Sequence, residues 1–296
     1  MTLHVVGNIC VDIAMRVAAL PAPGETVNAV ECLRGPGGKG ANQALAATRT
    51  GAKVRFWSAV GQDAEGSRLV DTVAAAGLPV IDIARVGAAT DMSVVLVSAS
   101  AENIVASCVD CARTIGDATV TAVATGLRPG DALLLQGNLA PAVTGALAAA
   151  ARQAGIRLAV NASPLESPAF PPCDLLVVNR GEAESLSGHS DIEAALHTLH
   201  GLGARDVVVT LGADGAVGLC GGKRFRRAAI PVEAVDTSGA GDVFCGVVAA
   251  LWHAGMALPM AVGMAVEAAA LAVTRPGTFE SCPSRGEMQA IMLRKD

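Results

Sequence analysis

Residues 235–244 read VDTSGAGDVF, a run of small residues that leads into an aspartate and an apolar stretch. Small side chains let the backbone turn tightly, and the free N–H groups and dipole of the helix expected to follow favour a phosphate group there. Asp242 falls in the first turn of that helix, where its carboxylate can accept a proton from an alcohol beside a phosphoryl group in transfer. The alternative is structural: Gly239 and Gly241 shape a turn, and Asp242 only interacts favourably with the helix dipole.

A second glycine-rich stretch, RGPGGKGANQA at residues 34–44, contains the Gly-Lys pair of a Walker A loop. That loop requires Ser or Thr directly after the lysine, and Gly40 stands there instead, which excludes it. Lys39 and Asn42 are three residues apart at the start of an expected helix, so both can face one cavity, where their polar groups suit sugar hydroxyls. The alternative is a glycine-rich loop with a solvated lysine.

Three further stretches follow expected strands, which is where ligands bind in open α/β sheets. Residues 7–12, GNICVD, place Asp12 after the first strand, where it can pair with sugar hydroxyls or simply end the strand in a turn. The GxGxxG fingerprint is absent here, which disfavours a dehydrogenase. Residues 179–184, NRGEAE, and 210–215, TLGADG, lie where nucleotide contacts belong, although a turn explains their glycine and acidic residues equally well.

The elements that must position these residues alternate regularly along the chain. Apolar strands are expected at residues 3–7, 54–60, 131–136, 156–160, 174–178, 206–210 and 216–220. Helices are expected at residues 39–49, 64–76, 141–154, 240–254 and 259–274. Continuous apolar strands separated by helices predict one doubly wound α/β domain over residues 1–296, with a mostly parallel sheet and helices on both faces.

Two segments interrupt this alternation. Residues 11–34 lack a helical period and place Pro21, Pro23 and Gly24 between β-prone stretches. Residues 90–109 contain two further strands, expected at 92–98 and 103–108. We expect these segments to form a small β-sheet lid at the carboxyl edge of the main sheet.

The composition excludes several classes of protein. The 296-residue chain is 52% hydrophobic, so it can form a sizeable core, but only 2% aromatic, which argues against a base-stacking platform for nucleic acid. Its formal net charge is −5, and the densest basic run, residues 223–227, is expected to be a solvated strand or hairpin. Nucleic acid is therefore not an expected partner.

The eight cysteines and the most apolar segment favour a cytoplasmic protein without a membrane span. The cysteines are scattered and no signal peptide is evident, which predicts reduced thiols. The CxxC spacing of Cys108 and Cys111 has no second pair to complete a zinc site. Residues 256–274 are nearly all apolar but contain Glu267, so a buried helix is expected rather than a bilayer helix.

Together these stretches resemble the ribokinase-like (PfkB) family of carbohydrate kinases, over residues 3–284. The most specific matches are GGKGANQ at residues 37–43 and DTSGAGD at residues 236–242, with further likeness at residues 23–26, 179–182 and 210–215. The resemblance implies ATP-dependent phosphorylation of a primary hydroxyl of a small sugar. Ribose, giving ribose 5-phosphate, is the first expectation, because residues 37–43 resemble ribokinases more than other branches.

The resemblance also implies roles for individual residues. Asp242 would be the catalytic base, beside an anion hole formed by Gly239, Ala240 and Gly241. The sugar would be held by Cys10, Asp12, Gly38, Lys39, Gly40, Asn42 and Asn138. ATP would contact Asn179, Thr210, Gly212, Gly215 and Gly241. Glu182 would organise Mg²⁺ through water, and a K⁺ ion would lie among Asp236, Ser238, Ala272, Arg275, Gly277 and Ser281, partly through backbone carbonyls.

The sequence departs from the ribokinase pattern at two sugar-facing positions. Cys10 stands where ribokinases usually have Asn, and Asn138 stands near the position of their usual Glu. The resemblance therefore implies a kinase but leaves the sugar open, and a nucleoside or a fructose derivative is an alternative acceptor. A catalytically silent sugar- or nucleotide-binding protein is a further alternative, against which Asp242 and its complete glycine loop argue. The resemblance also implies a homodimer formed through the lid.

Overall fold

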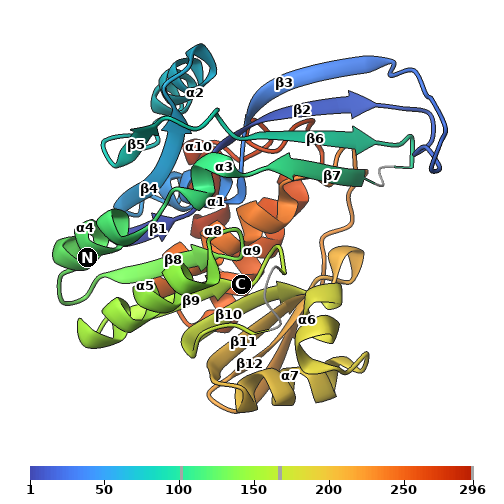
Figure 1. Cartoon of the computed structure of the whole chain (residues 1–296). Helices are drawn as coiled ribbons and strands as arrows, with labels where there is room; N and C mark the ends of the chain where they lie inside the picture. Colours follow the sequence, from blue (N-terminus) through green and yellow to red (C-terminus); the bar gives the residue numbers. More distant parts are fainter. Residues whose placement is uncertain (101–102, 166–168, 295–296) are drawn as a thin grey trace.

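A twisted nine-stranded sheet forms the centre of the protein (Figure 1). The computed structural model describes residues 1–100, 103–165 and 169–294. In spatial order, the strands are β13 (Lys223–Arg227), β12 (Ala216–Cys220), β11 (Ala204–Thr210), β10 (Cys173–Asn179), β9 (Arg157–Asn161), β8 (Ala132–Gln136), β1 (Leu3–Val6), β4 (Val54–Gly61) and β5 (Ile83–Val86). The strands from β11 to β5 run parallel, and β12 and β13 add an antiparallel hairpin at one edge. The predicted mostly parallel sheet is confirmed.

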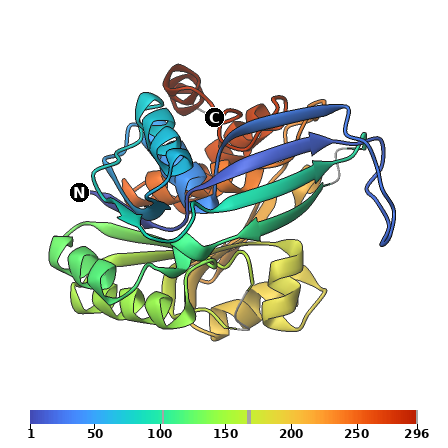
Figure 2. The same ribbon diagram turned by 45° about the horizontal axis from the view of Figure 1, so that its top comes forward.

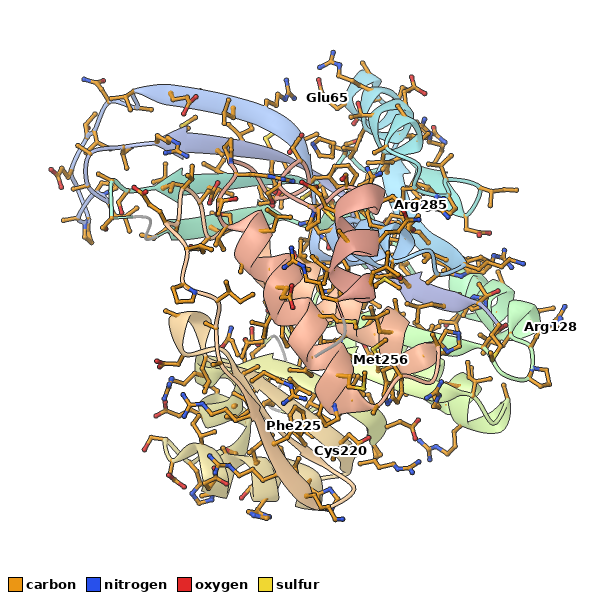
Figure 3. The ribbon with its side chains drawn as sticks, turned by 180° about the vertical axis from the view of Figure 1, so that it is seen from behind. Glu65, Arg128, Cys220, Phe225, Met256 and Arg285 are labelled. Carbon is orange, nitrogen blue, oxygen red and sulfur yellow. The ribbon has the colours of Figure 1, made fainter. Side chains whose placement is uncertain are left out.

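Helices cover both faces of this sheet, each over its own apolar cluster. One face carries α1 (Lys39–Arg49), α2 (Ala64–Ala75), α8 (Ala240–His253), α9 (Leu258–Ala272) and α10 (Arg285–Leu293). The other carries α3 (Asp110–Arg113), α4 (Asp117–Gly126), α5 (Pro141–Gln153), α6 (Arg180–Ser187) and α7 (Ile192–Gly201). Figure 3 shows the first face from behind, with Met256 at the turn between α8 and α9 and with Cys220 and Phe225 on the β12–β13 hairpin.

A separate four-stranded sheet extends beyond the main body (Figures 1 and 2). Its strands, in spatial order, are β3 (Glu31–Gly37), β2 (Cys10–Arg16), β6 (Met92–Val97) and β7 (Asn103–Cys108). They come from the two segments predicted to form a lid, although β2 begins one residue earlier and β3 continues to Gly37. Residues 101–102 of the second segment lie outside the described residues. Because β3 is followed at once by α1, the small sheet is joined directly to the glycine-rich stretch.

The apolar segment at residues 256–274 forms a core helix, as predicted. It corresponds to α9, which has 15 residues, several of them fully buried against α8 and the sheet. Over the described ranges 1–100, 103–165 and 169–294, no helix combines the length and the apolar character needed to cross a membrane.

Candidate active site

The start of α8 has the geometry expected of an anion site. Gly239 precedes the helix with a left-handed φ of 77°, and a Cβ atom there would lie 2.6 Å from the carbonyl oxygen of Thr278, so glycine is required. The N–H groups of Asp242 and Val243 both donate to the Gly239 carbonyl oxygen at 3.0 Å. The Gly241 N–H group has no backbone acceptor among the described residues, and it remains available at the helix end.

The carboxylate of Asp242 is buried and held from both sides by α1. Only 7% of Asp242 is exposed, and its Oδ2 atom accepts a hydrogen bond from Asn42 Nδ2 at 3.0 Å. Its Oδ1 atom accepts one from Gln43 Nε2 at 3.0 Å and lies 3.9 Å from Lys39 Nζ. Packing of α1 against α8 thus brings together the two glycine-rich motifs, although Asn42 and Asp242 are 200 residues apart in sequence.

Asp12, on β2, faces the same region from the small sheet. Its Oδ1 atom accepts from Cys10 Sγ at 3.2 Å, and its Oδ2 atom accepts from Thr278 Oγ1 at 2.5 Å. Burial raises the pKa of Asp12 above its ordinary value, the two hydrogen bonds oppose this, and the charge of Asp242 adds to it. Two carboxylates whose charges interact therefore flank one site.

Cys10 is a thiol in this site, not a thiolate. It is 1% exposed, and its Sγ atom lies 3.4 Å from Ser93 Oγ as well as contacting Asp12. Burial, followed by the neighbouring Asp12 charge, raises the pKa of the Cys10 thiol well above its ordinary value. Cys10, the first residue of β2, thus presents a neutral, weakly polar group to this site.

Two predicted sugar contacts carry a buried amide oxygen without a hydrogen-bond partner among the described residues, and Gln136 has a third such oxygen, Oε1. Asn42 Oδ1 and Asn138 Oδ1 are buried and have no hydrogen-bond partner among the described residues. Buried polar atoms are normally paired, so these oxygens fit a polar ligand that donates hydroxyl hydrogens. Two glycines bring the start of α1 close to the end of β1. Gly38 precedes α1 with a φ of 94°, and the Gly40 N–H group lies 3.4 Å from Asn8 Oδ1.

A cavity of about 620 Å³ adjoins the start of α8, and Asp12 does not line it. It is lined by all five positions predicted to contact the nucleotide: Asn179, Thr210, Gly212, Gly215 and Gly241. The rest of its wall is mostly apolar and includes Ile230, Pro231, Val232, Phe244 and Val266. An apolar cavity with a few polar groups at one end suits a flat aromatic base with phosphates.

Two of the predicted ligand contacts also have a structural role. Asn179 and Glu182 form a capping box at the start of α6: Asn179 Oδ1 accepts from the Glu182 N–H at 2.9 Å, and Glu182 Oε2 accepts from the Asn179 N–H at 2.8 Å. The cap satisfies backbone groups that the helix leaves free. It uses one Glu182 oxygen and leaves Oε1 outside the cap.

The residues predicted to hold a potassium ion come together in two adjacent loops. Asp236 is 3% exposed, and its carboxylate accepts the N–H groups of Ser238 at 2.9 Å and Gly277 at 3.0 Å. Ser281 is fully buried. The side chain of Arg275 forms an ion pair with Glu287 of α10 at 2.5 Å. Ala272 ends α9 beside them. The described residues contain no cluster of three or more His, Cys, Asp or Glu side chains that could hold a metal.

Sequence reasoning missed three polar residues and the apolar wall of the site. Gln43 lies inside the quoted GGKGANQ motif, but no spacing rule indicates its contact with Asp242. Ser93 and Thr278 contact Cys10 and Asp12 only because β6 and the loop after α9 fold onto β2. The apolar wall residues 229–232 and 234 lie in a stretch before Asp236 that has neither a helical nor a strand period, and that is the signal that could have indicated them.

An aspartate at a helix start, a glycine loop before that helix and an adjoining apolar cavity are the features of a phosphotransferase that acts on an alcohol. The chain belongs to the pfkB family of carbohydrate kinases, whose model matches residues 2–285. It is 32% identical to a ribokinase of Haemophilus influenzae over 97% of this chain and 96% of that protein. It is 29% identical to a deoxyribokinase of Salmonella typhi over 96% of each chain. A structure of Arabidopsis thaliana ribokinase complexed with ribose and ATP superposes with a TM-score of 0.84, at 25% identity, covering 99% of both chains.

Proposed function

We propose that this carbohydrate kinase transfers the γ-phosphoryl group of ATP to the primary hydroxyl of a pentose, with ribose 5-phosphate as the first candidate product. The observation that carries the proposal is Asp242, buried at the start of α8 and fixed by Asn42 and Gln43 between the sugar-facing residues and the apolar cavity. The relatives named ribokinase, and the ribokinase structure with ribose and ATP, support the choice of substrates.

The reaction follows from the positions of these groups. Asp242 accepts the proton of the sugar hydroxyl, whose oxygen forms a bond to the γ-phosphorus while the bond to the bridging β,γ-oxygen breaks and ADP leaves. The N–H groups of Gly239, Ala240 and Gly241 stabilise the charge of the transferring group. Asp12, Gly38, Lys39, Gly40, Asn42 and Asn138 would hold the sugar hydroxyls, and Asn179, Thr210, Gly212 and Gly215 the nucleotide.

Two cations are part of the proposal. When bound, Mg²⁺ would neutralise phosphate charge, and Glu182 Oε1, which the capping box leaves free, would hold it through water. K⁺ would fit the paired loops, where Asp236 already ties Gly277 to Ser238 and backbone carbonyls would be the main ligands. A pre-organised loop here would fix Gly239, which packs against Thr278.

A second candidate substrate is 2-deoxyribose. Cys10 gives its S–H group to Asp12 and is a weak donor, so it offers a sugar less than the amide that ribokinases usually have. A pentose with one hydroxyl fewer loses nothing there. The likeness to a deoxyribokinase at 29% identity supports this candidate as well.

The small sheet would act as a lid and as a dimer contact. Arg16 on β2 donates to the Val235 carbonyl oxygen at 3.4 Å, so the sheet already touches the loop before the anion site. Val30, Leu33, Ile104 and Val105 expose apolar surface on or beside this sheet, which a second copy of the chain would cover. The eight cysteines are free, in keeping with the proposed cytoplasmic location, and neither nucleic acid nor a membrane is a proposed partner.

The test is ADP release across a panel of ribose, 2-deoxyribose, hexoses and nucleosides. The proposal expects release that depends on a pentose and that Asp242→Asn nearly abolishes. Turnover that is faster with a nucleoside or a hexose than with either pentose would contradict the substrate, and sugar-independent ATP hydrolysis would contradict the kinase mechanism.

A further inference from the structure

A chain of buried amides runs from the core of the sheet to Asp242. Gln43 on α1 is fully buried, and its Nε2 atom donates both to Asp242 Oδ1 at 3.0 Å and to Asn161 Oδ1 at 2.9 Å. Its Oε1 atom accepts from Gln136 Nε2 at 2.9 Å. Asn161 Nδ2 in turn donates to the Val177 carbonyl oxygen at 2.9 Å. The chain therefore joins α1 to the ends of β8, β9 and β10 directly behind the carboxylate.

The two ends of this chain fix the orientation of every amide in it. A backbone carbonyl and an ionised carboxylate can only accept hydrogen bonds. The Val177 carbonyl therefore turns the Asn161 oxygen towards Gln43, and Asp242 turns the Gln43 nitrogen towards itself. Both hydrogens of Gln43 Nε2 are used, and its oxygen is left for Gln136. No other orientation of Gln43 satisfies the same groups.

The consequence for Asp242 is a carboxylate with a fixed rotation. Asn42 holds Oδ2 and Gln43 holds Oδ1, each at 3.0 Å, so the plane of the carboxyl group is set from two directions. Each carboxylate oxygen has about two acceptor positions, and one on each oxygen stays free for a substrate hydroxyl. A general base works only if that free position points at the hydroxyl within hydrogen-bond reach.

We infer that Gln43 is a positioning residue: with Gln136 and Asn161 behind it, it aims Asp242 at the sugar hydroxyl without contacting the sugar. The inference rests on the proposed function, in which Asp242 is the base. Gln43 acts through Asp242 alone, so its removal slows the chemical step and leaves the binding of sugar and ATP unchanged. Asn42 differs from it, because its Oδ1 atom meets no partner among the residues that the structure describes and suits the sugar as well.

The test compares wild type, Gln43→Met, Asp242→Asn and the double variant, with ATP and the pentose that wild type phosphorylates faster. Methionine keeps the length and the apolar packing of glutamine but donates nothing to Asp242. We expect a kcat lower by about 10- to 100-fold, the effect of losing a hydrogen bond to a charged group, with both KM values within about twofold of wild type. In the Asp242→Asn background, Gln43→Met should cause no further loss, because residues that act as a unit are not additive.

Two further variants keep the test decisive. Gln153→Met makes the same change at an exposed glutamine at the end of α5 and should leave the kinetics unchanged. Gln136→Met keeps the hydrogen bonds that Asn42 and Gln43 donate to Asp242 but removes the one that Gln43 Oε1 accepts. It should therefore cause a smaller kcat loss of the same kind, and it carries the test if Gln43→Met does not fold.

Failure of this inference can be told apart from failure of the proposed function. A kcat of Gln43→Met within twofold of wild type, an equal loss in the Asp242→Asn background, or a rise in KM that accounts for the loss would overturn the positioning role. Absence of sugar-dependent ADP release by wild type, or full activity of Asp242→Asn, would instead overturn the proposed function.

Discussion

Replacement of Cys10 tests how the sugar is chosen. The Cys10 side chain is 1% exposed, and its Sγ atom lies 3.2 Å from Asp12 Oδ1 and 3.4 Å from Ser93 Oγ. In Cys10→Asn, an amide that can both donate and accept takes the place of a weak donor beside the carboxylate that would hold the sugar. A neutral hydrogen bond contributes about 0.5–1.5 kcal/mol, or about two- to tenfold in affinity.

The second departure adds to the first. Asn138 Oδ1 is buried and has no hydrogen-bond partner in the described part of the chain, and Asn138→Glu would place a charged acceptor there. A hydrogen bond to a charged group contributes about 1.5–3 kcal/mol, so with the gain from Cys10→Asn the double variant should favour ribose over 2-deoxyribose by about thirtyfold or more beyond wild type. The assay is kcat/KM for both pentoses, measured by ADP release for wild type and for the single and double variants.

Stability must be followed in parallel, because an added atom in a filled site typically costs about 1–3 kcal/mol. Cys10→Ala is the control, since it adds no hydrogen-bonding group and should change the ratio little. A ribose to 2-deoxyribose ratio that moves by less than twofold in a folded double variant would refute the reasoning.

Three further predictions concern pH and salts. Burial raises the pKa of Asp12, and its ionised form accepts hydrogen bonds from sugar hydroxyls more strongly than its protonated form does. The sugar KM should therefore rise as the pH falls through that raised pKa, and Asp12→Asn should give a high KM that no longer depends on pH. A parallel pH profile in both proteins would refute this. Potassium should give faster turnover than sodium or lithium at equal ionic strength, because the loops joined by Asp236 and Gly277 carry the proposed site; equal rates in the three salts would count against it. Burial lowers the pKa of His253, and both of its ring nitrogens lack partners among the described residues. The unfolded chain therefore binds a proton at His253 more readily, and the free energy of unfolding should fall as the pH drops below about 6.5 until the folded pKa is reached. Thermal melting should show a smaller acid-induced loss of stability for His253→Phe than for wild type.

Much of the fold could be predicted because local patterns and tertiary packing agree there. The bounds of α1 and β12 match the expected ones, and the apolar, alanine-rich α8 and α9 differ by one or two residues at their ends. Strand β5 and helices α3, α4, α6, α7 and α10 were not predicted. Helix α4 contains several Val and Thr residues, which disfavour an isolated helix, so its packing on the sheet decides the outcome.

Two missed helices did carry a local signal. The capping boxes Asn179 with Glu182 and Ser284 with Glu287 mark the starts of α6 and α10. From the sequence we expect ligand contacts or a turn for the first pair, and not a helix cap, although a residue at a helix start can both cap the helix and contact a ligand.

In the candidate site, too, residues within a local motif could be predicted, and contacts that depend on tertiary packing could not. The motifs at residues 37–43 and 236–242 predict Lys39, Asn42 and Asp242, because each motif carries its chemistry within one turn of chain. The contacts of Gln43 could not be predicted, since it meets Asn161, which is 118 residues away, only after α1 packs on the sheet. The hydrogen bond from Thr278 to Asp12 spans 266 residues for the same reason.

The most direct test of the account is the rate of pentose-dependent ADP release by Asp242→Asn. Loss of a general base typically costs about 10²- to 10⁴-fold in rate, and the nearly isosteric amide should leave thermal stability and the binding of ATP and sugar close to wild type. A folded variant that binds both substrates and turns over that much more slowly is the predicted result. A kcat near that of wild type would contradict the assignment of Asp242 as the base, and with it the mechanism built around it.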